Sequence, residues 1–104
     1  MPYAPLLTDP EIDEGLRKLP DWERDGGWIV RTIRCPTFPT AIELVDRVAD
    51  AAEEANHHPD IAISWRNVTF RLTTKASDGL TVKDLAMAGT IGRLAADLPG
   101  AADR

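Results

Sequence analysis

The sequence predicts an α+β fold of two layers, in which a four-stranded antiparallel sheet carries helices packed on one face in the order αββαββα. Three segments place apolar residues at the spacing of one helix face, and four short segments are expected to be strands, the last two from their apolar alternation. The four segments come in two pairs, so we expect two antiparallel hairpins whose single apolar face the helices cover. We expect residues 1–104 to form one domain, because a chain of this length suits one hydrophobic core.

The first helix is expected over residues 9–18. Thr8 or Asp9 is a suitable N-cap, and Pro10 fits the first turn, where its missing N–H costs nothing. Pro20 ends the helix. Three apolar residues follow helical spacing on its buried side: Ile12, Leu16 and Leu19.

The first hairpin is expected from an extended segment that begins at Trp22, a turn over residues 25–27 and a strand over residues 28–35. Trp28 falls at a strand position expected in the core. Trp22 is compatible with two roles, a core residue or a stacking wall for a flat ligand.

A long second helix is expected after a loop bracketed by Pro36 and Pro39, with Thr40 as its cap and an end near Asn56. The charged residues of this segment fall mostly on one side and are expected to form a solvated face. The apolar residues on the other side define the buried stripe: Ile42, Val45, Val48, Ala49 and Ala52.

The second hairpin is expected from residues 61–65 and 68–72, with its turn at residues 66–67. Trp65 continues the apolar alternation and is expected in the core. No later strand covers the apolar strand from residue 68 to residue 74. Because such an edge invites pairing with a second copy, we expect a homodimer or a homotetramer.

The third helix has the clearest start signal in the chain. Thr81 is the expected cap, Asp84 completes an acidic variant of the capping box, and Leu80 is placed to contact Leu85. Pro99 and the glycine after it are expected to close the helix. Its core face is expected to contain Leu85, Ala88, Ile91, Leu94 and Ala95.

Composition argues against several classes of function. Seventeen acidic and twelve basic residues give a net charge of −5 with no basic block, so a nucleic-acid surface is not expected. Apolar runs fall far short of the roughly 20 residues that span a bilayer, and the N-terminus lacks a signal-peptide pattern. The single cysteine, Cys35, excludes an internal disulfide framework, is expected to be buried, and fits a cytoplasmic location.

Both histidines of the chain lie side by side at the expected end of the second helix. His57 and His58 precede Pro59, which disfavours helical backbone at His58 and so ends the helix. Histidine binds and releases protons near neutral pH, which suits acid–base chemistry. Glu53 lies four residues before His57, within reach of its ring on the same helix face.

This arrangement admits a structural interpretation as well. In that interpretation His57 caps helix carbonyl groups and His58 is a surface residue, and the pair alone leaves both interpretations open. A metal site is not expected, because two adjacent histidines with diverging side chains are a poor start for a ligand set. The chain also lacks the short motifs of nucleotide and zinc sites.

The residues around the histidines resemble the pterin-4a-carbinolamine dehydratase family over roughly residues 8–97. A His-His-Pro triplet, an aromatic residue at fixed spacing and a Gly-Leu-Thr helix start carry the resemblance. The matching positions are Glu53, His57, His58, Pro59, Trp65, Thr74, Gly79, Leu80, Thr81, Lys83 and Asp84, with Trp22 and Phe38 upstream.

The resemblance implies dehydration of 4a-hydroxytetrahydrobiopterin to quinonoid dihydrobiopterin, a step in tetrahydrobiopterin recycling that needs no metal or organic cofactor. It implies that His57 and His58 bind the pterin and carry protons. It further implies that Glu53 supports His57, that Trp22 forms a wall of the pocket, and that Asp84 helps to shape it.

One position departs from the family pattern. Lys75 stands where the family usually has a third catalytic histidine. Lysine amines hold their protons far more tightly than imidazoles, so a lysine is a poor two-way proton carrier at neutral pH. Three hypotheses follow: a slow or altered dehydratase, a non-catalytic dimerisation or assembly factor on the same scaffold, and a dehydratase of another heterocycle whose anionic group meets Lys75.

Overall fold

The computed structural model describes residues 4–100 and 102–103. The elements along the chain are three α-helices, the strands of one sheet and a short 3-10 helix. They are α1 (Asp9–Arg17), β1 (Glu23–Asp25), β2 (Trp28–Arg34), α2 (Phe38–Ala55), β3 (Asp60–Ser64), β4 (Asn67–Leu72), η1 (Lys75–Ser77), α3 (Val82–Ala96) and β5 (Ala102–Asp103).

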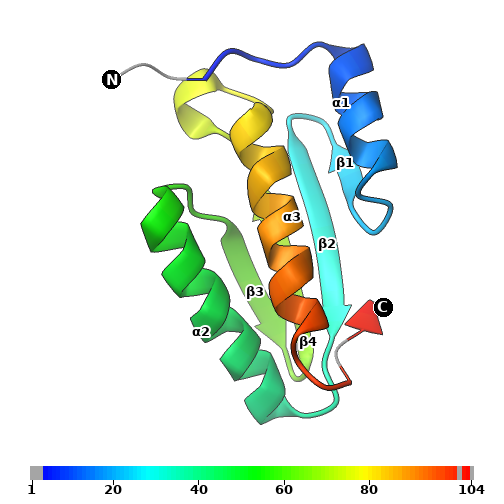
Figure 1. Ribbon diagram of the computed structural model, residues 1–104, viewed down its shortest axis with the longest axis vertical. Helices are drawn as coiled ribbons and strands as arrows, with labels where there is room; N and C mark the ends of the chain where they lie inside the picture. The colour runs from blue at the N-terminus through cyan, green and yellow to red at the C-terminus, as the bar shows by residue number, and fades with distance from the viewer. Residues whose placement is uncertain (1–3, 101, 104) are drawn as a thin grey trace.

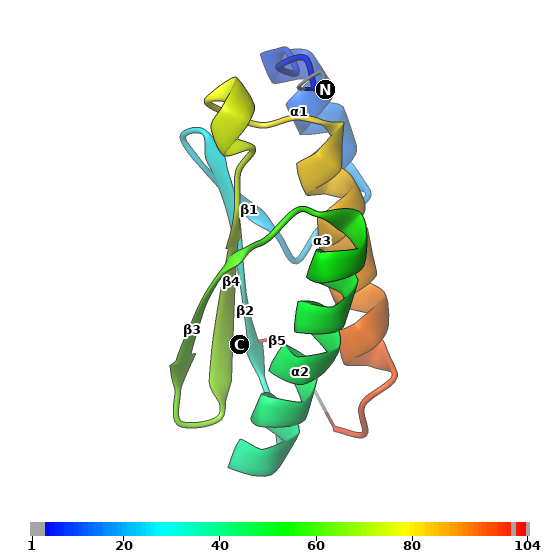
Figure 2. The same cartoon turned by 90° about the vertical axis from the view of Figure 1, so that its left-hand side faces the viewer.

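The strands form an antiparallel sheet in the order β1-β2-β4-β3, and β5 adds a short second pairing with β2. Figure 1 shows α2 and α3 lying side by side over the sheet, with α1 beside β1. Figure 2 shows that the three helices cover the same face. The predicted two-layer α+β fold is therefore confirmed.

The core lies between the sheet and the helices. Inward positions alternate along β2 and β4, and Ile29, Ile33, Val68, Phe70 and Leu72 are fully buried there. Burying side chains of this kind stabilises the fold by about 1.5–3 kcal/mol each before the entropy of ordering is counted. The helices contribute the facing residues Ala41, Leu44, Val48, Met87, Ala88, Ile91 and Ala95.

Helix α1 begins as the sequence predicts. Thr8 Oγ1 accepts a hydrogen bond from Glu11 N (3.3 Å), and Glu11 Oε1 accepts one from Thr8 N (2.8 Å), which completes a capping box. The backbone N–H and the hydroxyl of Thr8 lower the pKa of Glu11 because they bind its charged form.

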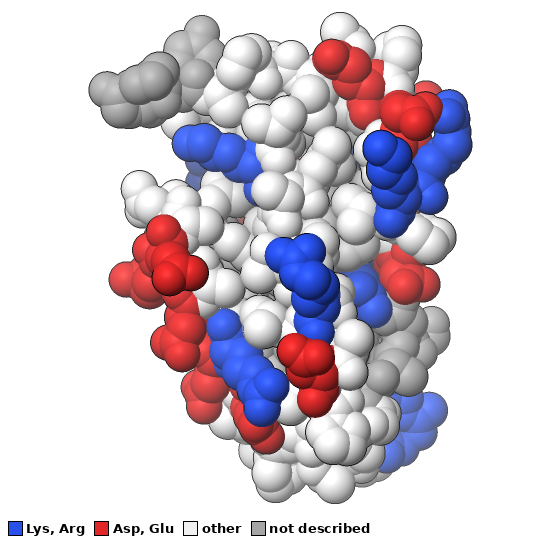
Figure 3. All heavy atoms as spheres, viewed as in Figure 1, with Lys and Arg blue, Asp and Glu red and all other residues white. Residues whose placement is uncertain are grey.

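Helix α2 begins earlier than predicted. Thr37, not Thr40, is the N-cap, and its Oγ1 accepts from Thr40 N at 3.1 Å. Pro39 therefore lies inside the first turn, where its missing N–H is tolerated, and the predicted loop ends at Thr37 instead of Pro39. Figure 3 shows acidic side chains gathered along the outer side of this helix, in agreement with the predicted solvated face.

The buried side of α2 is also rotated from the prediction. Ala41 and Leu44 are fully buried, whereas Ile42 is 38% exposed and Ala49 is exposed. Val48 and Ala52 are buried as predicted. The predicted and the observed buried stripes both contain Val48 and Ala52. The apolar pattern alone therefore could not distinguish one stripe from the other.

The second hairpin corrects the prediction about the sheet edge. Strand β4 pairs with β2 on one side and β3 on the other, so the edge is β3 and not the strand from residue 68 to residue 74. Every residue of β3 is exposed. Ile61 lies opposite Phe70 in the register, which places it on the helix-covered face at the uncovered margin of the sheet.

Two tryptophans predicted in the core lie elsewhere. Trp65 is a turn residue with a φ of 55° and is 68% exposed, with the guanidinium of Arg66 stacked 4.5 Å from its ring centre. The two-residue turn is thus Trp65–Arg66, one position earlier than predicted, because Ser64 pairs with Asn67. Trp28 is half-buried on the open face of the sheet beside Arg71.

Cys35 lies directly after β2 and is 1% exposed, as the sequence predicts. Burial raises the pKa of its thiol because the thiolate would lose its hydration. Cys35 therefore stays a protonated thiol at neutral pH, and we assign it a packing role.

Candidate active site

The histidine pair follows a left-handed turn that ends α2. Asn56 has a φ of 52°, and the backbone N–H of His57 donates to Ala52 O (3.1 Å), which is the hydrogen bond of a Schellman cap. The predicted end of the helix near Asn56 is correct. The turn directs His57 toward α3 and lets the chain continue through His58 and Pro59 into β3.

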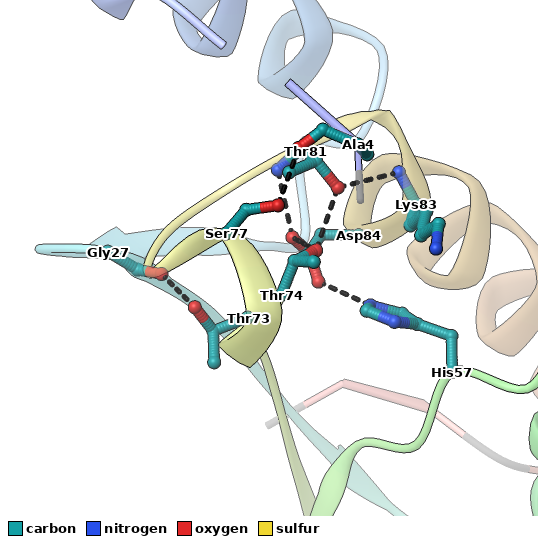
Figure 4. A network of polar contacts seen from close by, with 9 residues as sticks. All are labelled: Ala4, Gly27, His57, Thr73, Thr74, Ser77, Thr81, Lys83 and Asp84. Atoms are coloured by element: carbon teal, nitrogen blue, oxygen red, sulfur yellow. Dashed lines mark hydrogen bonds and ion pairs between the residues drawn. The ribbon is translucent and has the colours of Figure 1, made fainter. Parts of the chain in front are cut away.

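His57 is bound to a buried carboxylate from the start of α3. His57 Nε2 lies 2.6 Å from Asp84 Oδ1, with the His57 side chain 11% exposed and the Asp84 side chain fully buried (Figure 4). Asp84 was predicted at this site as a shaping residue. The structure shows that it is the direct partner of His57.

Asp84 is held by the cap of its own helix and by the end of β4. Its Oδ2 accepts hydrogen bonds from Thr81 N (3.0 Å) and from Thr74 Oγ1 (2.8 Å). A carboxylate only accepts hydrogen bonds, so this network assigns the proton of the His57 contact to Nε2. Nδ1 of His57 has no protein partner in the described part of the chain and is left as the basic ring nitrogen.

Glu53 does not support His57, in contrast to the prediction. Its Oε2 lies 2.5 Å from His58 Nε2, and the two side chains are 79% and 53% exposed. The left-handed turn at Asn56 is the reason, because it carries His57 inward and leaves His58 over the last turn of α2. The site therefore contains two histidine–carboxylate pairs, one buried and one at the surface.

A small pocket opens beside His57, between the end of α2 and the first half of α3. Its volume is about 160 Å³. Its lining combines an apolar floor with an imidazole, an amine and a hydroxyl: Ala55, His57, Lys83, Ala86, Met87 and Thr90.

Lys75 lines a different hollow, beside the turn between β1 and β2. This hollow has a volume of about 360 Å³ and is lined by Gly27, Trp28, Thr73, Lys75, Asp78 and Gly79. Lys75 Nζ is 3.7 Å from Asp60 Oδ1, and both side chains are more than half exposed. His57 and Lys75 thus line two separate concavities in this structure.

Trp22 lies in the core, which was one of its two predicted roles. It is 4% exposed and lines neither of the two pockets. Its indole Nε1 is buried without a hydrogen-bond partner among the described residues. The structure therefore gives no support to a stacking wall formed by Trp22.

Thr74 and Thr81 were not predicted to have a role in the site beyond their places in the motif and the helix cap. Both are buried and both contact Asp84. One signal was present: Thr74 follows Val68, Phe70 and Leu72 at the next inward position, where a hydroxyl needs a partner.

The described residues contain no cluster of three or more histidine, cysteine, aspartate or glutamate side chains that could hold a metal ion. Among the same residues, no helix is both long and apolar enough to cross a bilayer.

Comparison with known proteins decides the family. The family described as Pterin 4 alpha carbinolamine dehydratase matches residues 5–94. The chain belongs to this family. A Nocardia farcinica relative is 54% identical over 90 residues, which cover 86% of this chain and 95% of the relative. A Mycolicibacterium smegmatis relative is 48% identical over 92 residues, covering 88% and 98%. Both carry the provisional name pterin-4-alpha-carbinolamine dehydratase.

A solved structure agrees with the family fold. The crystal structure of a transcriptional coactivator/pterin dehydratase from Brucella melitensis superposes with a TM-score of 0.83 at 30% sequence identity, covering 86% of this chain and 97% of that one. The three helices and the antiparallel sheet described above are thus those of a pterin dehydratase fold.

Proposed function

We propose that the protein dehydrates 4a-hydroxytetrahydrobiopterin to quinonoid dihydrobiopterin, as part of tetrahydrobiopterin recycling in the cytoplasm. Membership of the dehydratase family supports the reaction class. The observation that carries the proposal is His57, which is anchored through Nε2 to buried Asp84 while Nδ1 remains available beside a small pocket.

The reaction loses water without oxidation or reduction. The bond between C4a and its hydroxyl oxygen breaks, an acid gives the leaving hydroxyl a proton, and a base takes a proton from a pterin ring nitrogen. In our proposal His57 Nδ1 is the base, because Asp84 stabilises the imidazolium that forms. His58, paired with Glu53 and half exposed, is the acid and regains its proton from solvent.

Acid–base chemistry of this kind needs no metal or organic cofactor. Pro59 supports the site by fixing the backbone after His58. Lys83 and Thr90 stand beside the pocket as hydrogen-bonding groups for a polar heterocycle.

A second candidate function is a binding or dimerisation scaffold without catalysis. Lys75 favours it, because this residue pairs with Asp60 and lines a hollow that does not include His57. The name of the Brucella melitensis neighbour, which combines a coactivator with a dehydratase, is compatible with either function.

Measurement of carbinolamine decay separates the two candidates. We expect the wild-type protein to accelerate the decay above the solvent rate, and Lys75→His to increase kcat by at least 10-fold, since a positioned acid–base group contributes about 10²- to 10⁴-fold. Lys18→His, at the exposed end of α1, is the control and should not change kcat. If neither the wild type nor Lys75→His exceeds the solvent rate, the dehydratase proposal is wrong and the scaffold is favoured.

We also propose that the protein forms a homodimer or homotetramer through the edge of the sheet. Strand β3 pairs only with β4 among the described residues, and Ile61 and Ile63 are each more than one third exposed on it. Two further apolar residues, Phe38 and Ile42 on α2, are also exposed.

Substitution of Ile63 tests this interface. We expect Ile63→Lys to shift the protein toward monomer, because a charge at the edge blocks strand pairing. Val82→Lys, at an exposed apolar position at the start of α3, should leave the mass unchanged. Light scattering measures both variants, and a wild-type protein that is monomeric at micromolar concentration would refute the interface.

A further inference from the structure

A chain of hydroxyl groups leads from the cap of α3 to the carboxylate that binds His57. Thr74, at 4% exposed, and Thr81, at 0%, lie behind Asp84 on the side away from the histidine (Figure 4). Neither threonine lines the pocket beside His57. Any influence they have on the histidine therefore passes through Asp84.

The backbone holds Thr74 in place. Thr74 N donates to Gly79 O (2.9 Å), and Thr74 O accepts from Gly79 N (3.3 Å) and from Ser77 N (3.0 Å). These bonds close the loop around η1 and make an isolated bridge between Thr74 and Gly79. The hydroxyl of Thr74 is thus fixed against Asp84 by the same bonds that shape the loop.

The protons along the chain have one consistent direction. Thr74 has a single hydroxyl proton and donates it to Asp84 Oδ2, so in its 2.7 Å contact with Thr81 the hydroxyl of Thr81 is the donor. Thr81 Oγ1 in turn accepts from Lys83 N (3.1 Å). Every proton points toward the carboxylate, which leaves Oδ1 free to accept from His57 Nε2.

We propose that Thr74 is a positioning residue that acts through Asp84 to fix His57 as the Nε2–H tautomer. The catalytic consequence rests on the proposed function, because only that tautomer presents a basic Nδ1 to the substrate. The structural part stands independently of any activity. Without the Thr74 hydroxyl, Asp84 Oδ2 keeps one donor, Thr81 loses its acceptor, and the carboxylate is released from its fixed orientation.

The variant Thr74→Val removes the hydroxyl and keeps the branched shape. We expect imidazole nitrogen NMR at mildly alkaline pH to show the Nε2–H form of His57 in the wild type and a mixture of both tautomers in Thr74→Val. We expect kcat to fall roughly 10-fold, by analogy with the loss that follows when the hydrogen-bond partner of a metal-bound histidine is removed. Thr74→Ser, which retains the hydroxyl, should restore both the tautomer and most of kcat.

Thr69→Val is the matched control. Thr69 lies on β4, which ends two residues before Thr74, and its hydroxyl contacts Thr32 Oγ1 at 2.8 Å on the opposite face of the sheet. We expect this variant to leave the His57 tautomer and kcat unchanged, even if its thermal stability falls as much as that of Thr74→Val. A purely structural role for Thr74 would lower stability without moving the tautomer.

The outcomes separate this inference from the proposed function. A wild-type protein with the Nε2–H tautomer but no dehydratase activity, whose tautomer changes in Thr74→Val, would refute the function and support the inference. An active wild type whose tautomer stays fixed in Thr74→Val would refute the inference alone. If Thr74→Val does not fold, the wild-type spectrum tests the inference by itself. An Nδ1–H form of His57 in the wild type would overturn the assigned Nε2–H tautomer.

Discussion

Replacement of His57 with alanine is expected to lower kcat for carbinolamine dehydration by roughly 10²- to 10⁴-fold, the usual contribution of a positioned acid–base group. The variant loses the basic nitrogen beside the pocket, and neither His58 nor Lys75 lines that pocket to replace it. Because KM reports mainly on the other contacts to the ring, we expect a smaller change in KM than in kcat.

Added imidazole provides a control for this experiment. The truncated side chain enlarges a pocket of about 160 Å³, so free imidazole should enter it and recover part of the lost rate. A folded variant that responds to imidazole separates a lost base from a damaged fold, because Asp84 Oδ1 also loses its partner in His57→Ala. An unchanged rate in His57→Ala would show that His57 is not the base.

Local signals in the sequence predicted the starts of α1 and α3 correctly, but not the start of α2. The capping boxes at Thr8 and Thr81 are formed by residues three positions apart, and such short-range chemistry can be recognised without knowledge of the fold. The capping box at Thr81 also predicted the position of Asp84 correctly. Its second role, as the partner of His57, joins positions 27 residues apart and depends on how α2 and α3 pack.

The errors arose where one residue or one strand pairing redirects the chain. Because the backbone of Asn56 is left-handed, Glu53 contacts His58 instead of His57, and helical spacing does not reveal such a turn. The positive φ of Trp65 moved it from the alternating pattern into the turn. The order of the two hairpins in the sheet set the edge at β3, and alternation within each strand carries no information about that order.

Among the proposed substitutions, Asp84→Ala is expected to cause the largest loss in the free energy of unfolding. Asp84→Ala leaves Thr81 N, Thr74 Oγ1 and His57 Nε2 without their acceptor in a buried site and removes the capping box of α3. Breaking a buried charged interaction by removing one partner typically costs about 3–5 kcal/mol. Urea unfolding measures this loss, and the exposed Asp97→Ala at the other end of α3 is the control, with an expected change within about 0.5 kcal/mol.

Asp84→Asn separates the stability of the network from its chemistry. An asparagine oriented with its oxygen toward Thr81 N and Thr74 Oγ1 keeps those two hydrogen bonds, but its amide group then donates toward His57 Nε2. His57 can accept that bond only as the Nδ1–H tautomer, which takes the basic nitrogen away from the pocket. We therefore expect most of the stability to remain while kcat falls roughly 10²- to 10⁴-fold, as expected for the loss of a correctly protonated base. Full activity in a stable Asp84→Asn variant would mean that the orientation of His57 does not depend on the buried carboxylate.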